Sequence, residues 1–175
     1  MAIRRASAYS RHKVVPFTRV SKRKNKSYIR AVPPRLIVKF TMGLTDLSKF
    51  PHHITLVSTE RIQLRQNAIE ACRQFINKGL TKGLAGQFYF KILPYPHHIQ
   101  RENRMITGAG ADRMQTGMQL SFGKTSAIAA LVKKDGELFF IAVANEKAVV
   151  LVRKLLQQIK SKLPCRTRVI YELKN

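Results

Sequence analysis

Residues 125–145, TSAIAALVKKDGELFFIAVAN, hold two apolar runs on either side of Asp135-Gly136. An Asp-Gly pair between such runs is the strongest short-range signal for a β-hairpin, because both positions tolerate left-handed backbone. The stretch therefore predicts two strands joined by a tight turn. Asn145 follows as the expected cap of a helix.

The flanking segments supply the remaining elements of an α+β fold. Strands are expected at 35–40, 52–57, 87–96 and 166–173, and a first helix within 58–79, capped by Ser58 or Thr59 and closed by Lys78-Gly79. Without regular βαβ alternation, the pattern favours two helices packed on one face of a mostly antiparallel sheet. The apolar helix faces are Ile62, Ile69, Cys72 and Ile76 in the first, and Ala148, Val152, Leu155, Ile159 and Leu163 in the second.

The charge of the chain points to a polyanionic partner. Thirty-three Lys and Arg against nine Asp and Glu give a net charge of +24 over 175 residues. These cations lie mainly in a tail and in loops rather than on a basic amphipathic helix, so nucleic acid is favoured over a membrane surface. No signal peptide or membrane-spanning run is expected, and Cys72 and Cys165 are interpreted as buried thiols in a reducing cytoplasm.

Residues 1–34 form a basic N-terminal arm, and residues 35–175 a single α+β domain. Residues 1–35 contain eleven Lys and Arg and no acid, and the first acid of the chain is Asp46. Tyr28 lies among the cations and is available for base stacking, so the arm is expected to become ordered on RNA. The predicted rRNA-binding residues are Arg4, Arg5, Arg11, Lys13, Arg19, Lys22, Arg23, Lys24, Lys26 and Arg30.

Residues 101–125 form a long, glycine-rich connection between two expected strands. Compact domains rarely keep such long loops unless the loop is functional. The Gly123-Lys124-Thr125 ending suggests a nucleotide-binding P-loop, but the required first glycine falls on Met118. A dinucleotide fingerprint fails as well, because Arg113 occupies the position of its third small residue. The favoured interpretation is a basic finger against nucleic acid.

The sequence contains no recognisable catalytic or metal-binding constellation. His52-His53 and His97-His98 are adjacent pairs, and neighbours on a strand point to opposite faces. The acids are scattered, and Ser121 lacks the flanking glycines of a nucleophile elbow. We therefore expect no enzymatic activity, no cofactor, no metal and no small-molecule substrate.

Several motifs resemble the universal large-subunit ribosomal protein family called L-sixteen in bacteria and L-ten-e in archaea and eukaryotes. RRASAYSR and PFTR resemble the basic arm of the family, RQNAIEACR its first helix, YPHHIQREN the strand entering its loop, and GAGADRMQTGMQLSFGK the loop itself. The arm and YPHHIQREN are of archaeal type. Gln119-Leu120 and Thr125-Ser126 depart from the family pattern.

The resemblance implies an α/β-hammerhead type of fold and a place in the large subunit of cytoplasmic ribosomes. Its implied partners are large-subunit rRNA near the 5S rRNA and the A-site region, tRNA, and neighbouring ribosomal proteins, with the loop directed toward the P-site and the peptidyl-transferase centre. The loop residues carried over are Arg101, Arg104, Gly108, Gly110, Arg113, Gln115, Thr116, Gly117 and Lys124. The alternatives are a free-standing RNA- or DNA-binding regulator and, less favoured, a nucleotide-dependent enzyme.

Overall fold

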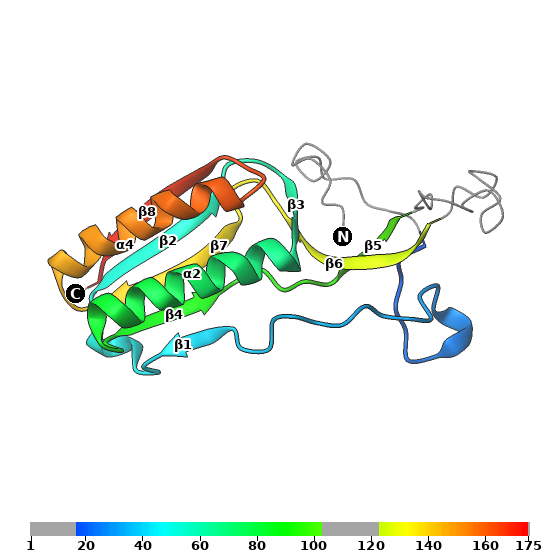
Figure 1. The fold of residues 1–175 in the computed structure, drawn as a ribbon, viewed down its shortest axis with the longest axis horizontal. Coiled ribbons are helices and arrows are strands. Elements are labelled where there is room, and N and C mark those ends of the chain that lie inside the picture. The colour runs from blue at the N-terminus through cyan, green and yellow to red at the C-terminus, as the bar shows by residue number, and fades with distance from the viewer. Residues whose placement is uncertain (1–16, 103–122, 175) are drawn as a thin grey trace, which may run out of the picture.

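The computed structural model describes residues 17–102 and 123–174 (Figure 1). The described strands are β1 (Thr41–Gly43), β2 (His52–Ser58), β3 (Ile62–Arg65), β4 (Phe88–Ile92), β5 (His98–Glu102), β6 (Lys124–Val132), β7 (Glu137–Val143) and β8 (Thr167–Leu173). The helices are α2 (Gln66–Leu84) and α4 (Glu146–Ile159), with short 3-10 turns η1 (Lys24–Lys26), η2 (Leu47–Lys49) and η3 (Lys160–Lys162).

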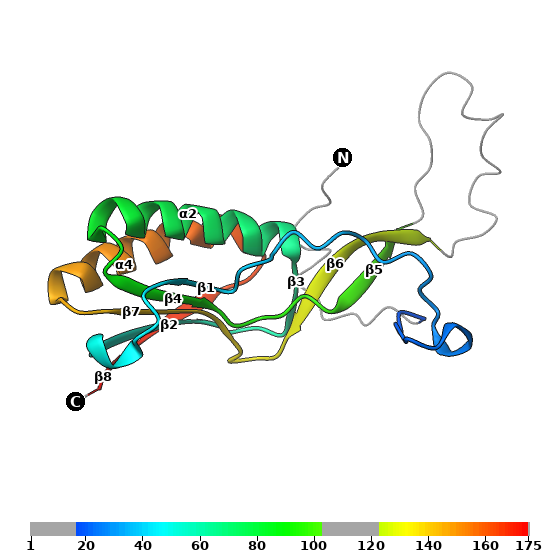
Figure 2. The ribbon, with the colours of Figure 1, turned by 90° about the horizontal axis from the view of Figure 1, so that it is seen from below.

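The strands form two antiparallel sheets. The larger has the order β1-β4-β7-β2-β8, and the smaller has the order β3-β6-β5. Both α2 and α4 lie on the same face of the larger sheet, and the smaller sheet extends from one end of this body (Figure 2). The predicted class, two helices on a mostly antiparallel sheet, is confirmed.

The hairpin predicted at Asp135-Gly136 is wrong, although the turn itself forms. The Gly136 N–H donates to the Lys133 carbonyl at 3.1 Å, and Asp135 has a φ of 58°. Ser58, at the end of β2, exchanges backbone hydrogen bonds with Asp135 and Gly136 at 2.8 and 2.9 Å. Because β2 occupies the place beside the turn, β7 pairs with β2 and β4, whereas β6 leaves to pair with β3 and β5. The Asp-Gly turn therefore joins two sheets.

The first helix begins later than predicted. Ile62 lies in β3, paired with Val132, and α2 starts at Gln66. The predicted capping residues bond elsewhere: the Ser58 hydroxyl donates to the Glu60 carbonyl at 2.7 Å, and the Thr59 hydroxyl to the Arg166 carbonyl at 3.1 Å. A strand pairing with β6 has thus replaced the expected first helical turn.

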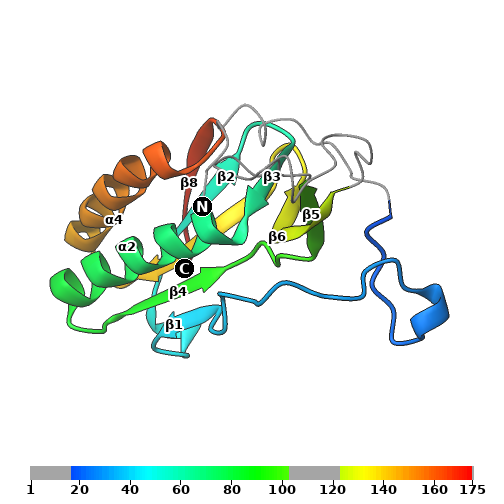
Figure 3. The same ribbon diagram turned by 45° about the vertical axis from the view of Figure 1, so that its right-hand side comes forward.

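The same helix also runs past the predicted stop at Gly79 and ends at Leu84. A Cβ at Gly79 would stand 2.6 Å from a methyl of Leu155, and one at Gly83 would stand 2.5 Å from a methyl of Leu151. These glycines therefore let α2 approach α4 closely (Figure 3). Gly79 serves helix packing and does not terminate the helix.

Residues 35–40 do not form the predicted strand. Gln66, the first residue of α2, holds this segment instead: its amide donates to the Pro34 carbonyl at 3.0 Å and accepts from the Leu36 N–H at 3.2 Å. Sheet pairing begins at Thr41, in β1. Gly43 has a φ of 87°, and a Cβ there would overlap the Phe88 carbonyl oxygen, so the close pairing of β1 with β4 requires a glycine.

The core lies between the helices and the larger sheet. The predicted positions Ile69, Cys72 and Ile76 of α2 are buried, as are Ala148, Val152 and Ile159 of α4, together with Leu163 beyond it. The burial expected of Leu155 belongs to its neighbour: Leu156 is fully buried, whereas Leu155 is half-buried against α2. Asn145 precedes α4 and accepts bonds through its backbone carbonyl rather than its side chain.

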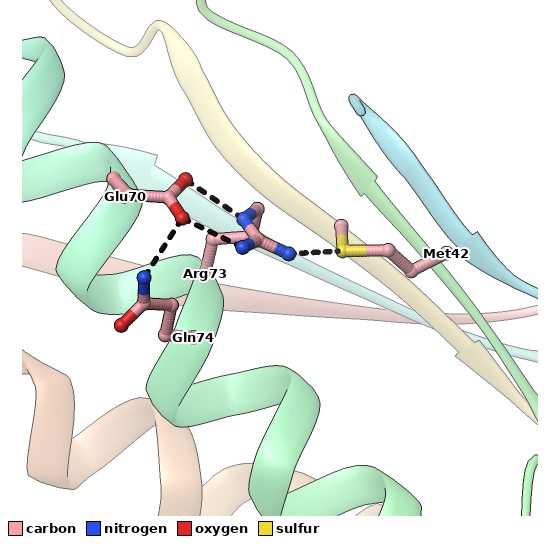
Figure 4. A network of polar contacts seen from close by, with 4 residues as sticks. All are labelled: Met42, Glu70, Arg73 and Gln74. Carbon is pink, nitrogen blue, oxygen red and sulfur yellow. Dashed lines mark hydrogen bonds and ion pairs between the residues drawn. The ribbon is translucent and has the colours of Figure 1, made fainter. Parts of the chain in front are cut away.

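A polar network fastens α2 to the edge strand β1 (Figure 4). Arg73 donates two hydrogen bonds to the Glu70 carboxylate, at 2.6 and 2.8 Å, and a third to the Met42 sulfur at 3.4 Å. Gln74 donates to the same carboxylate at 3.0 Å. The hydrogen bond from Arg73 holds the pKa of Glu70 below its ordinary value.

Candidate nucleic-acid interface

The described part of the arm is a folded turn, defined here as the arm turn, residues 17–31. The Arg19 carbonyl accepts hydrogen bonds from the N–H groups of Tyr28 and Ile29 at 3.0 and 3.3 Å. The Arg19 side chain returns a bond from Nε to the Lys26 carbonyl at 2.6 Å. With Ile29 only 3 % exposed, this segment has an ordered conformation of its own.

Aromatic contacts brace the same turn. The rings of Phe17 and Tyr28 meet edge to face with centroids 5.2 Å apart. The Arg19 guanidinium lies 4.9 Å above the Tyr28 centroid. Tyr28 is still 50 % exposed, so part of its side chain remains open to solvent. Cation–π contacts of this kind stabilise by about 0.5–1 kcal/mol at exposed positions.

All of the predicted RNA-binding cations in the described part of the arm are exposed on this turn. They are Arg19, Lys22, Arg23, Lys24, Lys26 and Arg30. A shallow cleft of about 580 Å³ lies among Ser21, Lys24, Asn25, Ser27, Ile29 and Arg30. The turn therefore presents a concentrated positive surface, with hydroxyl and amide groups between the charges. Phosphate oxygens are the natural acceptors for such a surface.

Arg101 links the arm turn to the base of the glycine-rich loop. Its guanidinium donates to the Gly123 carbonyl at 3.1 Å and to the carbonyls of Phe17 and Tyr28 at 3.3 and 3.2 Å. Thr125, on β6, adds a bond from its hydroxyl to the Ala31 carbonyl at 3.1 Å. Arg101 was predicted as a tRNA-facing residue, but the structure gives its guanidinium protein carbonyls as partners.

The structure describes only some of the remaining predicted residues. Lys124 is exposed at the start of β6, opposite Glu102 of β5. The other predicted residues lie outside the described part of the chain: Arg4, Arg5, Arg11 and Lys13 in the arm, and Arg104, Gly108, Gly110, Arg113, Gln115, Thr116 and Gly117 in the loop.

The histidines of β2 point to opposite faces of the larger sheet, as the strand geometry predicts. His52 contacts the Tyr171 hydroxyl through Nδ1 at 2.7 Å, whereas the His53 ring meets Phe140 with centroids 5.1 Å apart. Burial lowers the pKa of His53. Within residues 17–102 and 123–174, no group of three His, Cys, Asp or Glu side chains could hold a metal ion.

Both cysteines are free thiols. Cys72 is buried in the core, and burial raises its pKa to about 12. Cys165 is partly buried, which also raises its pKa. A thiol whose pKa is raised carries little of the nucleophilic thiolate at neutral pH.

In the described residues, no helix is long and apolar enough to cross a membrane.

A second group of cations lies on the folded body and was missed in the sequence. Arg153, Lys154 and Lys160 are exposed along α4 and its end, and Arg166 and Arg168 lie on or beside β8. A sequence signal for them exists, because seven Lys and Arg and no acid occur between Glu146 and Glu172. In the sequence these cations are interspersed with the apolar period of the helix and do not form a run of their own.

Comparisons with known proteins agree on one family. The family model described as ribosomal protein L16p/L10e matches residues 16–170. The large ribosomal subunit protein uL16 of Saccharolobus islandicus (strain L.S.2.15 / Lassen #1) is 40 % identical over 146 residues, covering 82 % of this chain and 82 % of that protein. The uL16 proteins of Pyrobaculum arsenaticum and Pyrobaculum neutrophilum are 38 % and 39 % identical over 178 residues, covering 99 % of this chain and 94 % of each relative.

Proposed function

The chain belongs to the ribosomal protein L16p/L10e family, whose members are structural constituents of the large ribosomal subunit, and from this premise we propose that its arm turn binds large-subunit rRNA. The observation that carries the proposal is the arm turn itself: six exposed cations on one ordered segment without an acid. The family also implies neighbouring ribosomal proteins as partners and a place in the cytoplasmic ribosome. No catalytic role is proposed.

The chemistry of the arm turn suits the RNA backbone more than it suits base edges. Lys and Arg neutralise phosphates, and each neutralised phosphate makes the affinity more sensitive to salt. Because the turn is already folded by its own hydrogen bonds, less conformational entropy is lost on binding than for a flexible tail. Tyr28 can add stacking on an unpaired base.

The finer placement follows the family. We propose contacts near the 5S rRNA and the A-site region, with the loop of residues 101–125 directed toward tRNA in the P-site. The described support is indirect: Arg101 and Thr125 bind the base of this loop to the arm turn. RNA bound by the arm would therefore fix the direction in which the loop leaves the protein.

The test of rRNA binding is incorporation into large subunits, together with a salt titration. The triple variant Arg23→Ala, Lys24→Ala, Lys26→Ala should sediment poorly with large subunits. In direct rRNA binding, its plot of log affinity against log salt should be shallower by about 2–3 units. The double variant Lys78→Ala, Lys82→Ala removes exposed cations from α2 and serves as a control. An unchanged slope for the triple variant would refute phosphate binding by the arm.

The finer proposal has its own measurement. Subunits reconstituted with Arg113→Ala should assemble but bind P-site tRNA more weakly, by about tenfold if one charge-assisted contact is lost. Normal binding of P-site tRNA would show that Arg113 makes no contact with tRNA that contributes to binding. Binding of rRNA without entry into subunits would instead favour the free-standing regulator.

A further inference from the structure

A basic groove lies between α4 and β8, on the folded body rather than on the arm. We call it the α4–β8 groove. It has a volume of about 360 Å³ and is lined by Arg153, Gln157, Lys160 and Val169. Figure 1 shows α4 and β8 on the helical body, away from the arm turn. Neither the arm nor the loop accounts for it.

The central cation of the groove is held in place by an aromatic support. The Arg153 guanidinium lies 5.5 Å above the centroid of Tyr171, on β8. The Tyr171 hydroxyl bonds to Nδ1 of His52 at 2.7 Å, and the two rings stack with centroids 6.0 Å apart. Arg153 therefore packs on the ring of Tyr171, and His52 of β2 holds that ring by a hydrogen bond and by stacking. A guanidinium oriented in advance loses less entropy when it binds a bidentate anion.

The segment that forms the groove carries charge of one sign. Arg153, Lys154 and Lys160 are exposed, and none of the residues from Lys147 to Tyr171 is an acid. Glu172 is next along β8, but it pairs with His53, whereas Tyr171 pairs with Ile54. Since successive side chains on a strand point to opposite faces, Glu172 lies on the face of the sheet away from α4. No carboxylate of β8 thus competes for Arg153 from the groove side.

We propose that the α4–β8 groove is a second RNA-backbone site, in which Arg153 and Lys160 bind phosphates and Tyr171 positions Arg153. The proposal rests on the proposed function, because it takes the protein to be an rRNA-binding constituent of the large subunit. It adds a contact surface on the helical body, apart from the arm turn. The protein would then contact RNA through the arm turn and through its helical body.

The experiment uses the full chain and purified large-subunit rRNA as the probe, with affinity measured from about 50 to about 300 mM KCl. The double variant Arg153→Gln, Lys160→Gln should flatten the salt slope by about two units, one for each lost phosphate contact. Lys78→Gln, Lys82→Gln removes the same charge from α2 and should leave the slope within about half a unit. Both pairs are exposed, and thermal unfolding checks that each variant is folded.

Two tyrosine variants separate positioning from charge. Tyr171→Leu removes the ring under Arg153 and should weaken binding several-fold at an unchanged slope, since no cation is lost. Tyr171→Phe keeps the ring and should restore most of the affinity. Equal affinities of the two variants would show that the ring has no positioning role.

The outcomes distinguish the two proposals. If wild-type protein does not bind rRNA, the proposed function fails. If it binds, and the arm variant but not the groove variant changes the slope, the groove proposal alone is overturned. A groove variant that binds free rRNA normally but no longer joins large subunits would also overturn it, and would assign the groove to a protein neighbour.

Discussion

Replacing Arg101 should release the arm turn without unfolding the domain. Arg101 donates to the carbonyls of Phe17 and Tyr28 in the arm, and to that of Gly123 at the loop base. Hydrogen bonds from charged groups contribute about 1.5–3 kcal/mol each. The low end applies here because the two arm bonds are exposed to water. Their joint loss in Arg101→Ala is then about 3 kcal/mol, or roughly a hundredfold in the docking equilibrium.

Amide hydrogen exchange measures this release. The N–H groups of Tyr28 and Ile29 donate to the Arg19 carbonyl within the arm turn, so their protection reports on opening of the segment. In Arg101→Ala their protection should fall by up to about a hundredfold, and the free energy of global unfolding should fall by no more than the same amount of about 3 kcal/mol, because docking of the arm stabilises only the folded domain.

Two further variants sharpen the result. Arg101→Lys keeps the charge but not the forked donor geometry, and should recover only part of the protection. Lys124→Ala removes an exposed charge from the same loop base and should leave the protection of Tyr28 and Ile29 unchanged. Protection in Arg101→Ala within about twofold of wild type would refute the reasoning.

Three other comparisons test the fold by denaturant unfolding. Gly43→Ala and Gly86→Ala both place a side chain at a φ of 87°, but only Gly43 faces a backbone carbonyl. Gly86→Ala should therefore cost about 1–2 kcal/mol of stability, and Gly43→Ala clearly more. Equal losses would contradict the assigned contact between β1 and β4. Leu156→Ala should cost about 2–5 kcal/mol, against a smaller loss for the half-buried Leu155→Ala, and the reverse order would show that the register of α4 is wrong. Glu70→Gln should destabilise the protein at neutral pH. Because the folded-state pKa of Glu70 is lowered, its stabilising contribution is present above the ordinary value of 4.5 and is lost as the pH falls through the lower folded value. A difference in unfolding free energy between variant and wild type that does not narrow in acid would be inconsistent with the Arg73 pairing.

The strands and helices that local pattern alone determines were predicted well. β4 and β8 fall inside predicted strands, β2 runs one residue past its predicted end, and the apolar period located both helices. Local signals failed where a distant segment competed for the same backbone. Asp135-Gly136 formed its turn, yet Ser58 took the position that the partner strand of a hairpin would occupy. Gly79 has the composition of a helix stop, but the approach of Leu155 gives it another role.

The candidate site likewise has a part that follows from local sequence and a part that depends on distant contacts. Charge in the arm could be read directly, because unpaired cations in an acid-free segment indicate a polyanion whatever the fold. The contacts of Arg101 could not, since they join three segments that only the folded chain brings together. Arg153 was visible only as one cation on an amphipathic helix. Its support by Tyr171 depends on the pairing of β8 with β2.

The long strand β6 gives the protein a mechanical property. Its nine residues span about 30 Å at roughly 3.3 Å per residue. Val132 anchors one end in the core, and Thr125 is latched to the arm near the other. Its inner residues pair with β3 and its outer residues pair with β5, and Ala129 has a neighbour on each side. A partner strand therefore supports β6 along almost its whole length. A push at its outer end is therefore transmitted to the Asp-Gly turn and from there to β7. The protein can thus carry strain between the arm turn and the packed layer under its helices.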